Sequence, residues 1–344
     1  MKYSISERTL HFKQPAGTSR GVYTTRKIWL VKLSDGEREG VGECAPLPDL
    51  SCDAMDDERY EMLLDKFCQK LCETGEIDYE AMRDYPSMLF GLETALGDVR
   101  VKKEDGRSIL FDTAFSRGEV GIPINGLVWM GNYEEMLQRM EEKLEKGFRC
   151  VKLKIGAIDF EKELDLVKRI RDRFSFHEVE LRLDANGAFK YEEALYKLEL
   201  LSQYAIHSIE QPIKAGQWAF MAELCRESPL PIALDEELIG VNDPEMKHHM
   251  LNVIKPRYII LKPSLHGGMM GCREWIDIAR EMGIGSWITS ALESNIGLNA
   301  IAQFASDVYG DDITMPQGLG TGQLFTDNFD MGLDIRKDKL WRCL

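Results

Sequence analysis

Short apolar segments that each end in a charged residue recur at a nearly constant spacing along residues 151–262. The segments are V-K-L-K-I-G with Lys152 and Lys154, V-E-L-R-L-D ending at Asp184, I-H-S-I-E ending at Glu210, P-I-A-L-D ending at Asp235 and Y-I-I-L-K ending at Lys262. From Lys154 on, the successive charged residues are 30, 26, 25 and 27 residues apart. Each step has the length of one strand, one helix and two loops. The repeat therefore predicts an α/β fold, a (β/α) barrel of the TIM type whose polar residues gather at the C-terminal ends of its strands.

The repeat extends on both sides of this series. Gly121–Val128 is predicted as the first barrel strand, and segments ending near Ser290 and Gly318 as the seventh and eighth. We therefore expect an eight-stranded barrel over residues 116–319. A chain of 344 residues is longer than a barrel of roughly 250. Residues 1–115 alternate like strands and then turn helical, which predicts an α+β capping domain, completed by the tail 320–344.

The composition excludes several classes of partner. A formal charge of −15 argues against nucleic acid and anionic membranes, because both need a basic surface. The N-terminus is too polar for a signal peptide, and no apolar run approaches the roughly 18 residues of a membrane span. The eight cysteines have no zinc-site spacing. We expect a cytoplasmic protein with a small-molecule substrate. The net negative charge does not exclude an anionic substrate, because cations inside a pocket dominate its local field.

Three of the strand-end residues are acids on consecutive predicted strands. Asp184, Glu210 and Asp235 would therefore offer hard oxygen ligands at one end of the barrel. Mg²⁺ suits such a set, with Mn²⁺ as an alternative ion, because these cations bind carboxylate oxygens and keep positions open for substrate. A single acid at a strand end can equally cap the following helix. Three in succession favour a metal site.

Three lysines surround these acids in the predicted barrel. Lys152 and Lys154 share a face because side chains along a strand repeat every two residues, and the barrel points that face inward. An edge strand with a solvated face is the alternative for this pair. Lys262 ends the sixth strand, across the barrel mouth. Lysines on both sides of a metal suit removal of a proton α to a carboxylate, since the cation stabilises the enediolate that forms.

These residues together resemble the enolase superfamily, in its muconate-lactonizing-enzyme-like subgroup. The resemblance spans almost the whole chain and includes G-V-G-E-C-A-P-L-P-D-L-S, P-S-M-L-F-G-L-E-T-A-L-G-D, L-R-L-D-A-N-G-A-F and I-T-S-A-L-E-S-N-I-G-L. Within the subgroup the match favours the members that dehydrate 2-succinyl-6-hydroxy-2,4-cyclohexadiene-1-carboxylate to o-succinylbenzoate in menaquinone synthesis. The implied chemistry is that of a lyase.

The resemblance also implies a role for each residue. Lys154 would take the α-proton and then help the hydroxyl leave from the same face, while Lys262 would stay cationic against the ring. Lys152 would contact the substrate carboxylate. The remaining substrate contacts implied are Ser290 and Gly318 near the succinyl arm, and Ser19, Arg20 and Pro48 in two loops of the capping domain. A mobile, solvated hairpin tip is the alternative for the first of these loops.

Two other functions remain open at this point. An N-acylamino acid racemase or dipeptide epimerase of the same subgroup would use the same lysines and metal. Epimerases of the subgroup usually carry an acidic motif after the eighth strand, whereas M-P-Q-G-L-G-T-G has no acid before Asp327. This difference favours the lyase. A barrel that binds ligand without turnover is the more distant alternative, and the intact set of charged residues argues against it.

Overall fold

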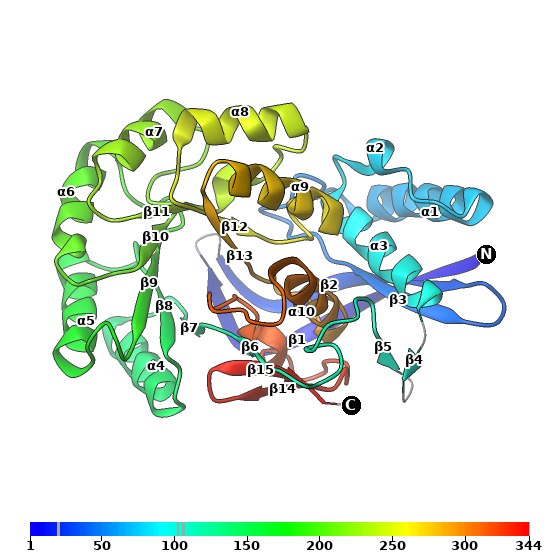
Figure 1. Ribbon diagram of the computed structural model, residues 1–344, viewed down its shortest axis with the longest axis horizontal. Helices are drawn as coiled ribbons and strands as arrows, with labels where there is room; N and C mark the ends of the chain where they lie inside the picture. Colours follow the sequence, from blue (N-terminus) through cyan, green and yellow to red (C-terminus); the bar gives the residue numbers. More distant parts are fainter. Residues whose placement is uncertain (19–20, 102, 105–106, 344) are drawn as a thin grey trace.

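The N-terminal part of the computed structural model is an antiparallel sheet covered by helices (Figure 1). The structure describes residues 1–18, 21–101, 103–104 and 107–343. The strands are β1 (Lys2–Thr18), β2 (Gly21–Ser34) and β3 (Glu39–Cys44), in that order across the sheet, and the helices are α1 (Asp57–Thr74), α2 (Tyr79–Met82) and α3 (Pro86–Arg100). Val31 and Leu33 alternate inward along β2, and α1 buries Tyr60 and Leu64 four residues apart. The buried side chains, spaced by two residues in the strand and by four in the helix, form one apolar layer between the sheet and the helices.

Glycines allow α3 to lie directly on β3. A Cβ atom added to Gly42 would stand 1.8 Å from the carbonyl oxygen of Gly91, and one added to Gly91 would stand 2.2 Å from the Cys44 sulfur. No other residue fits at such a separation. The G-V-G-E segment is therefore explained by helix packing, and it leaves Glu43 at the end of the sheet that faces the rest of the molecule.

The second part is a curled parallel sheet with helices on its outer face (Figure 1). Its strands follow the chain order: β7 (Gly126–Val128), β8 (Cys150–Lys154), β9 (Glu180–Asp184), β10 (Ser208–Glu210), β11 (Ile232–Leu234), β12 (Tyr258–Leu261) and β13 (Gly285–Ile288). The helices are α4 (Tyr133–Glu145), α5 (Phe160–Arg173), α6 (Tyr191–Ser202), α7 (Trp218–Glu227), α8 (Pro244–Ile254), α9 (Gly268–Glu281) and α10 (Asn295–Tyr309). This confirms a modified (β/α) barrel behind an N-terminal sheet domain.

Two of the eight predicted barrel strands differ from the prediction. Residues 121–128 divide into β6 (Ile122–Pro123), which belongs to another sheet, and β7. The expected eighth strand is not a regular strand, and single bridges join Gln317 to Ile124 and Gly318 to Thr289. Proline explains the interruption, since Pro316 and Pro123 have no N–H to donate to a ladder. The Gln317 side chain compensates by accepting a 2.7 Å bond from the Ile288 N–H.

The C-terminal tail contacts both parts of the chain. The Lys13 N–H donates to the Leu324 carbonyl at 2.8 Å, and the Thr326 N–H donates to the His11 carbonyl at 2.9 Å. Farther on, β14 (Leu333–Arg336) and β15 (Lys339–Arg342) form a hairpin that pairs with β6. The short elements that complete the description are β4 (Lys103–Glu104), β5 (Arg107–Ser108), η1 (Glu236–Leu238) and η2 (Gly320–Gln323). The domain limits at residues 115 and 320 stay a prediction.

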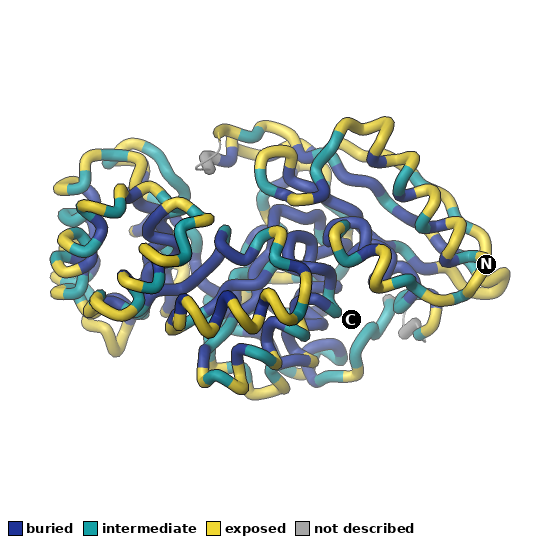
Figure 2. Tube along the Cα trace, turned by 90° about the horizontal axis from the view of Figure 1, so that it is seen from above, coloured by how far each residue is buried: buried dark blue, intermediate teal, exposed yellow. Residues whose placement is uncertain are grey.

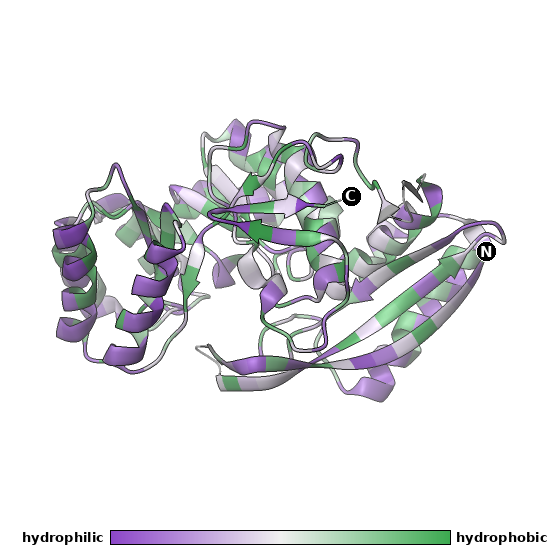
Figure 3. Cartoon of the chain, turned by 90° about the horizontal axis from the view of Figure 1, so that it is seen from below, coloured by the Kyte–Doolittle hydropathy of each residue, from purple (hydrophilic) through white to green (hydrophobic). Residues whose placement is uncertain are grey.

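The hydrophobic core lies between the curled sheet and its helices. Buried residues run through the centre of the molecule, and exposed ones lie on the outer surfaces of the helices (Figure 2). The helices at the left of Figure 3 carry mostly hydrophilic residues on the side in view. No helix within the described ranges has the length and apolar character to cross a membrane. Because neighbouring strands of the curled sheet are all parallel, their C-terminal ends lie at one mouth of the barrel.

Candidate active site

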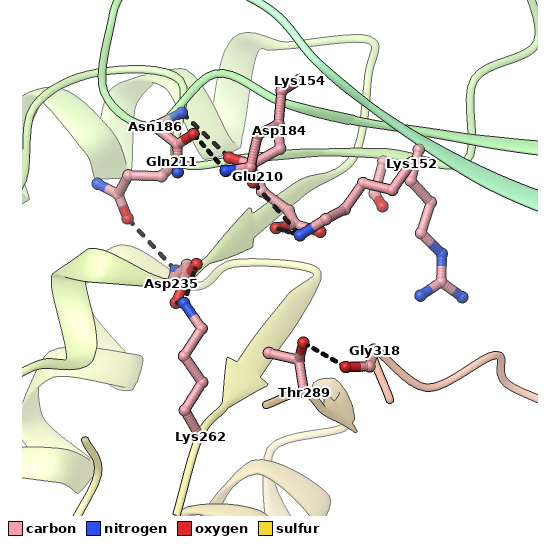
Figure 4. Close-up of polar contacts among 12 residues, drawn as sticks. Lys152, Lys154, Asp184, Asn186, Glu210, Gln211, Asp235, Lys262, Thr289 and Gly318 are labelled. Atoms are coloured by element: carbon pink, nitrogen blue, oxygen red, sulfur yellow. Dashed lines mark hydrogen bonds and ion pairs between the residues drawn. The ribbon is translucent and has the colours of Figure 1, made fainter. Parts of the chain in front are cut away.

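The sheet brings the charged strand-end residues to one place. Asp184 and Glu210 are the last residues of β9 and β10 and lie opposite each other in register. Lys154 ends β8 and lies opposite Asp184. Asp235 and Lys262 directly follow β11 and β12. Figure 4 shows Lys154 and Lys262 approaching this group from opposite sides of the view.

The three lysines form ion pairs with the three carboxylates, and the Lys152 Nζ contacts two of them, since it also lies 3.3 Å from Asp184 Oδ2. The Lys154 Nζ lies 3.1 Å from Asp184 Oδ2, and the Lys152 Nζ lies 2.7 Å from Glu210 Oε2. The Lys262 Nζ contacts both oxygens of Asp235 at 2.6 Å. All six side chains are at most 12% exposed. The ion pairs therefore sit in a low-dielectric setting, where they are stronger than in water.

The close packing of these charges moves several pKa values. Burial would raise the pKa of Asp184, but Lys154 and Lys152 hold it well below its ordinary value. Burial raises the pKa of Glu210 to about 8, with Asp184 and Asp235 adding to the effect and Lys152 opposing it. Burial would lower the pKa of Lys262, but Asp235 outweighs it and raises that pKa. Lys262 is therefore suited to remain cationic.

A histidine fixes the backbone at Lys262. His266 is 1% exposed, and its Nδ1 accepts the Lys262 N–H at 2.8 Å. Burial and the nearby Lys262 hold the pKa of His266 well below its ordinary value. It therefore stays neutral and holds the turn after β12.

Two further polar residues belong to the group and were missed from the sequence. Asn186 accepts a 2.7 Å bond from the Lys154 Nζ through Oδ1 and donates a 2.9 Å bond from Nδ2 to Glu236 Oε1. Asn186 has a φ of 44°, a left-handed conformation that asparagine tolerates better than most residues. The A-N-G turn after Asp184 and the second acid beside Asp235 were the available signals.

A cavity of about 560 Å³ opens at this mouth. Lys152, Lys154, Asp184, Asp235 and Lys262 line it, whereas Glu210 is fully buried behind them. The lining continues over residues from both parts of the chain, including Leu47, Leu50, Asn186, Glu236, Ser290, Leu292, Gly318 and Thr321. Polar groups thus meet an apolar wall in one pocket, which is typical of a small-molecule site.

The predicted substrate-contact residues divide into three groups. Lys152, Ser290 and Gly318 line the cavity, and the Ser290 hydroxyl lies 2.6 Å from that of Thr321. Pro48 is exposed and lies outside the lining, and Leu47 and Leu50 of the same loop line the cavity instead. The difference arises because that loop turns its leucines inward and its proline to solvent. Ser19 and Arg20 lie outside the described residues.

The three expected metal ligands lie at one barrel mouth, but their side chains are not oriented as a metal-binding group. Within the described ranges, no group of three or more His, Cys, Asp or Glu side chains is arranged to hold a metal ion. The carboxylates turn toward the lysines instead. The chemistry of the donors nevertheless fits Mg²⁺, because three adjacent strands supply carboxylate oxygens. In addition, the buried Glu210 Oε1 has no hydrogen-bond partner in the part of the chain described. A bound cation would compete with the ammonium groups for these oxygens.

Comparisons with known proteins match both parts of the chain. The enolase C-terminal domain-like family matches residues 135–329, and the MenC N-terminal domain matches residues 17–99. The o-succinylbenzoate synthase of Desulfotalea psychrophila is 46% identical over 97% of both chains. The crystal structure of MenC from that organism covers 99% of both chains, with 42% identity and a TM-score of 0.82. A dipeptide epimerase from Enterococcus faecalis, solved with Mg and L-Leu-L-Tyr, shares the fold at 18% identity, with 98% and 96% coverage and a TM-score of 0.81.

The chain belongs to the enolase superfamily, whose members generally use Mg²⁺. Within this superfamily the chain belongs to the o-succinylbenzoate synthase family, since the full-length relative and the MenC domain both match. The family recognised from the sequence motifs is thereby confirmed.

Proposed function

We propose that the chain dehydrates 2-succinyl-6-hydroxy-2,4-cyclohexadiene-1-carboxylate to o-succinylbenzoate, a step of menaquinone synthesis. The observation that carries this proposal is the pairing of three buried lysines with three carboxylates at one barrel mouth. The full-length likeness to an o-succinylbenzoate synthase supports the lyase over the epimerase. The complete charged set also argues against a barrel without turnover.

Lys154 acts as the base in the proposed reaction. Its Nζ lies at the cavity, next to Asp184 and Asn186, and its free amine would take the proton α to the ring carboxylate. The resulting ammonium then gives that proton to the departing hydroxyl on the same face, which leaves as water. The ring gains aromaticity in this second step, so proton abstraction is the demanding one. One lysine thus serves both steps.

Positive charge stabilises the enediolate between the two steps. Mg²⁺ would be held by Asp184, Glu210 and Asp235 and would supply charge opposite the substrate carboxylate oxygens. Lys262, cationic through Asp235, faces the cavity and would lie against the ring. Lys152 would contact the substrate carboxylate. Ser290 and Gly318 would border the succinyl arm.

Turnover with a matched lysine control tests this proposal. Loss of the diene absorbance of the substrate is followed with Mg²⁺ and with EDTA, in the wild type, Lys154→Ala and Lys247→Ala. Lys247 is a suitable control because it is also buried and ion-paired, to Glu274 at 2.7 Å, but lies outside the cavity lining. We expect Mg²⁺-dependent turnover that falls by at least about 10³-fold in Lys154→Ala alone. Exchange of the α-proton of dipeptides without dehydration would instead support the epimerase.

Other properties also stay predictions. Mn²⁺ is the alternative ion for the same ligands, and we expect the substrate to be a small carboxylate anion and the protein to act in the cytoplasm. No nucleic-acid or membrane partner is expected for a chain with a net charge of −15.

A further inference from the structure

A buried arginine connects the N-terminal sheet to the barrel mouth. Arg26 of β2 is 3% exposed. Its two terminal nitrogens donate to the carbonyls of Ala45 and Pro46, both at 2.5 Å. Its Nε donates to the Leu292 carbonyl at 3.3 Å. One guanidinium therefore binds a loop of the N-terminal part and a loop that follows β13.

Two buried glutamates surround this arginine and hold the same loops. Glu293 accepts the Ala291 N–H at 2.6 Å and the Ser264 hydroxyl. Glu43 accepts the N–H groups of Ser294 at 2.8 Å and Gly297 at 2.9 Å, at the start of α10. Burial lowers the pKa of Arg26, and the charges of Glu293 and Glu43 oppose that effect. A buried arginine is tolerated here because opposite charges and hydrogen bonds compensate it.

The loops that Arg26 joins supply the apolar wall of the cavity. Leu47, which directly follows Pro46, lines the cavity. On the other loop, the consecutive residues Ser290, Ala291 and Leu292 line it as well. Leu292 has a φ of 65°, a conformation that costs energy for a leucine and persists only where surrounding contacts hold it. The bond from Arg26 to its carbonyl is such a contact. Arg26 thus bonds directly to the loops that carry both Leu47 and Leu292.

We propose that Arg26 is a positioning residue that determines specificity for the non-reacting arm of the substrate. This inference rests on the proposed function, because it assigns the wall of Leu47 and Leu292 to the succinyl arm that Ser290 borders. The lysines and carboxylates that hold the reacting carboxylate come from other strands. Arginine suits the task because its planar fork reaches carbonyls on two loops at once, which lysine cannot do.

Binding of two ligands to Arg26→Lys tests the proposal. Dissociation constants of o-succinylbenzoate, which has the arm, and benzoate, which lacks it, are measured with Mg²⁺ present. We expect Arg26→Lys to weaken o-succinylbenzoate binding about tenfold and to change benzoate binding less than about twofold. In turnover, KM should rise by a similar factor with kcat nearly unchanged. Amide hydrogen exchange should speed up in residues 45–51 and 291–293.

Arg83→Lys provides the matched control. Arg83 also joins the two parts of the chain, since it donates to Glu274 Oε2 at 2.9 Å and to the Asn242 carbonyl at 3.0 Å, but it lies outside the cavity lining. It should leave both dissociation constants unchanged. Equal weakening of both ligands by Arg26→Lys, or the same effect from Arg83→Lys, would overturn the proposal. Failure of the wild type to bind o-succinylbenzoate would instead contradict the proposed function, and the exchange measurement would still test the joining of the loops.

Discussion

Binding of Mg²⁺ should stabilise the protein through Glu210. A ligand at a hundred times its dissociation constant adds about 2.7 kcal/mol to the free energy of unfolding. For 344 residues the unfolding entropy is about 0.7 kcal/mol per kelvin. The expected rise in Tm is therefore about 4 °C. Glu210→Gln keeps the shape of the side chain at a fully buried position with one unpartnered oxygen, but an amide cannot ionise to the carboxylate that a bound cation needs, so the rise should fall below about 1 °C.

Differential scanning calorimetry with Mg²⁺ and with EDTA measures this rise. Taking the difference between the two conditions removes the stability that Glu210→Gln loses when Lys152 loses its ion pair with Glu210 and keeps the one with Asp184. Asp53→Asn is the matched control, because Asp53 is also a buried carboxylate with one unpartnered oxygen but contacts Ser87 in the N-terminal part. It should keep the full rise. A full rise in Glu210→Gln, or its loss in Asp53→Asn, would refute the assignment of Glu210 as a ligand.

Two further predictions concern activity and pH. Asn186→Ala should lower kcat about tenfold to a hundredfold in steady-state turnover, because Lys154 and Glu236 each lose a hydrogen bond; an unchanged kcat would contradict a positioning role. Burial raises the pKa of Glu93 to about 8 although it accepts two N–H groups at the start of α9. The folded state thus binds this proton more tightly than the unfolded chain, so stability falls as the pH rises from about 5 to about 8, on the order of a few kcal/mol. Urea unfolding at several pH values should show a smaller fall in Glu93→Gln, and an equal fall in both proteins would disprove this origin.

The sequence allowed much of the barrel to be predicted because its signals are local. Each apolar run ends at the residue that enters the mouth, and the two-residue period places Lys152 and Lys154 on one face. These statements need no knowledge of distant contacts. The prediction of an eighth regular strand was wrong because it also rested on a local pattern. Pro316 interrupts the backbone pairing there, and the Gln317 side chain holds the segment instead. The spacing of apolar residues does not reveal such a contact.

The residues that the sequence did not indicate act through contacts between distant segments. Asn186 and Glu236 are 50 positions apart, and Arg26 and Leu292 are 266 apart. Nothing near Arg26 distinguishes it from a surface arginine, since its neighbours in β2, Thr25 and Lys27, are also polar. Its burial follows only from docking of the sheet on the barrel, which brings Glu43 and Glu293 beside it. The reacting groups could therefore be predicted from strand ends, whereas the groups proposed to select the substrate depend on how the two parts of the chain meet.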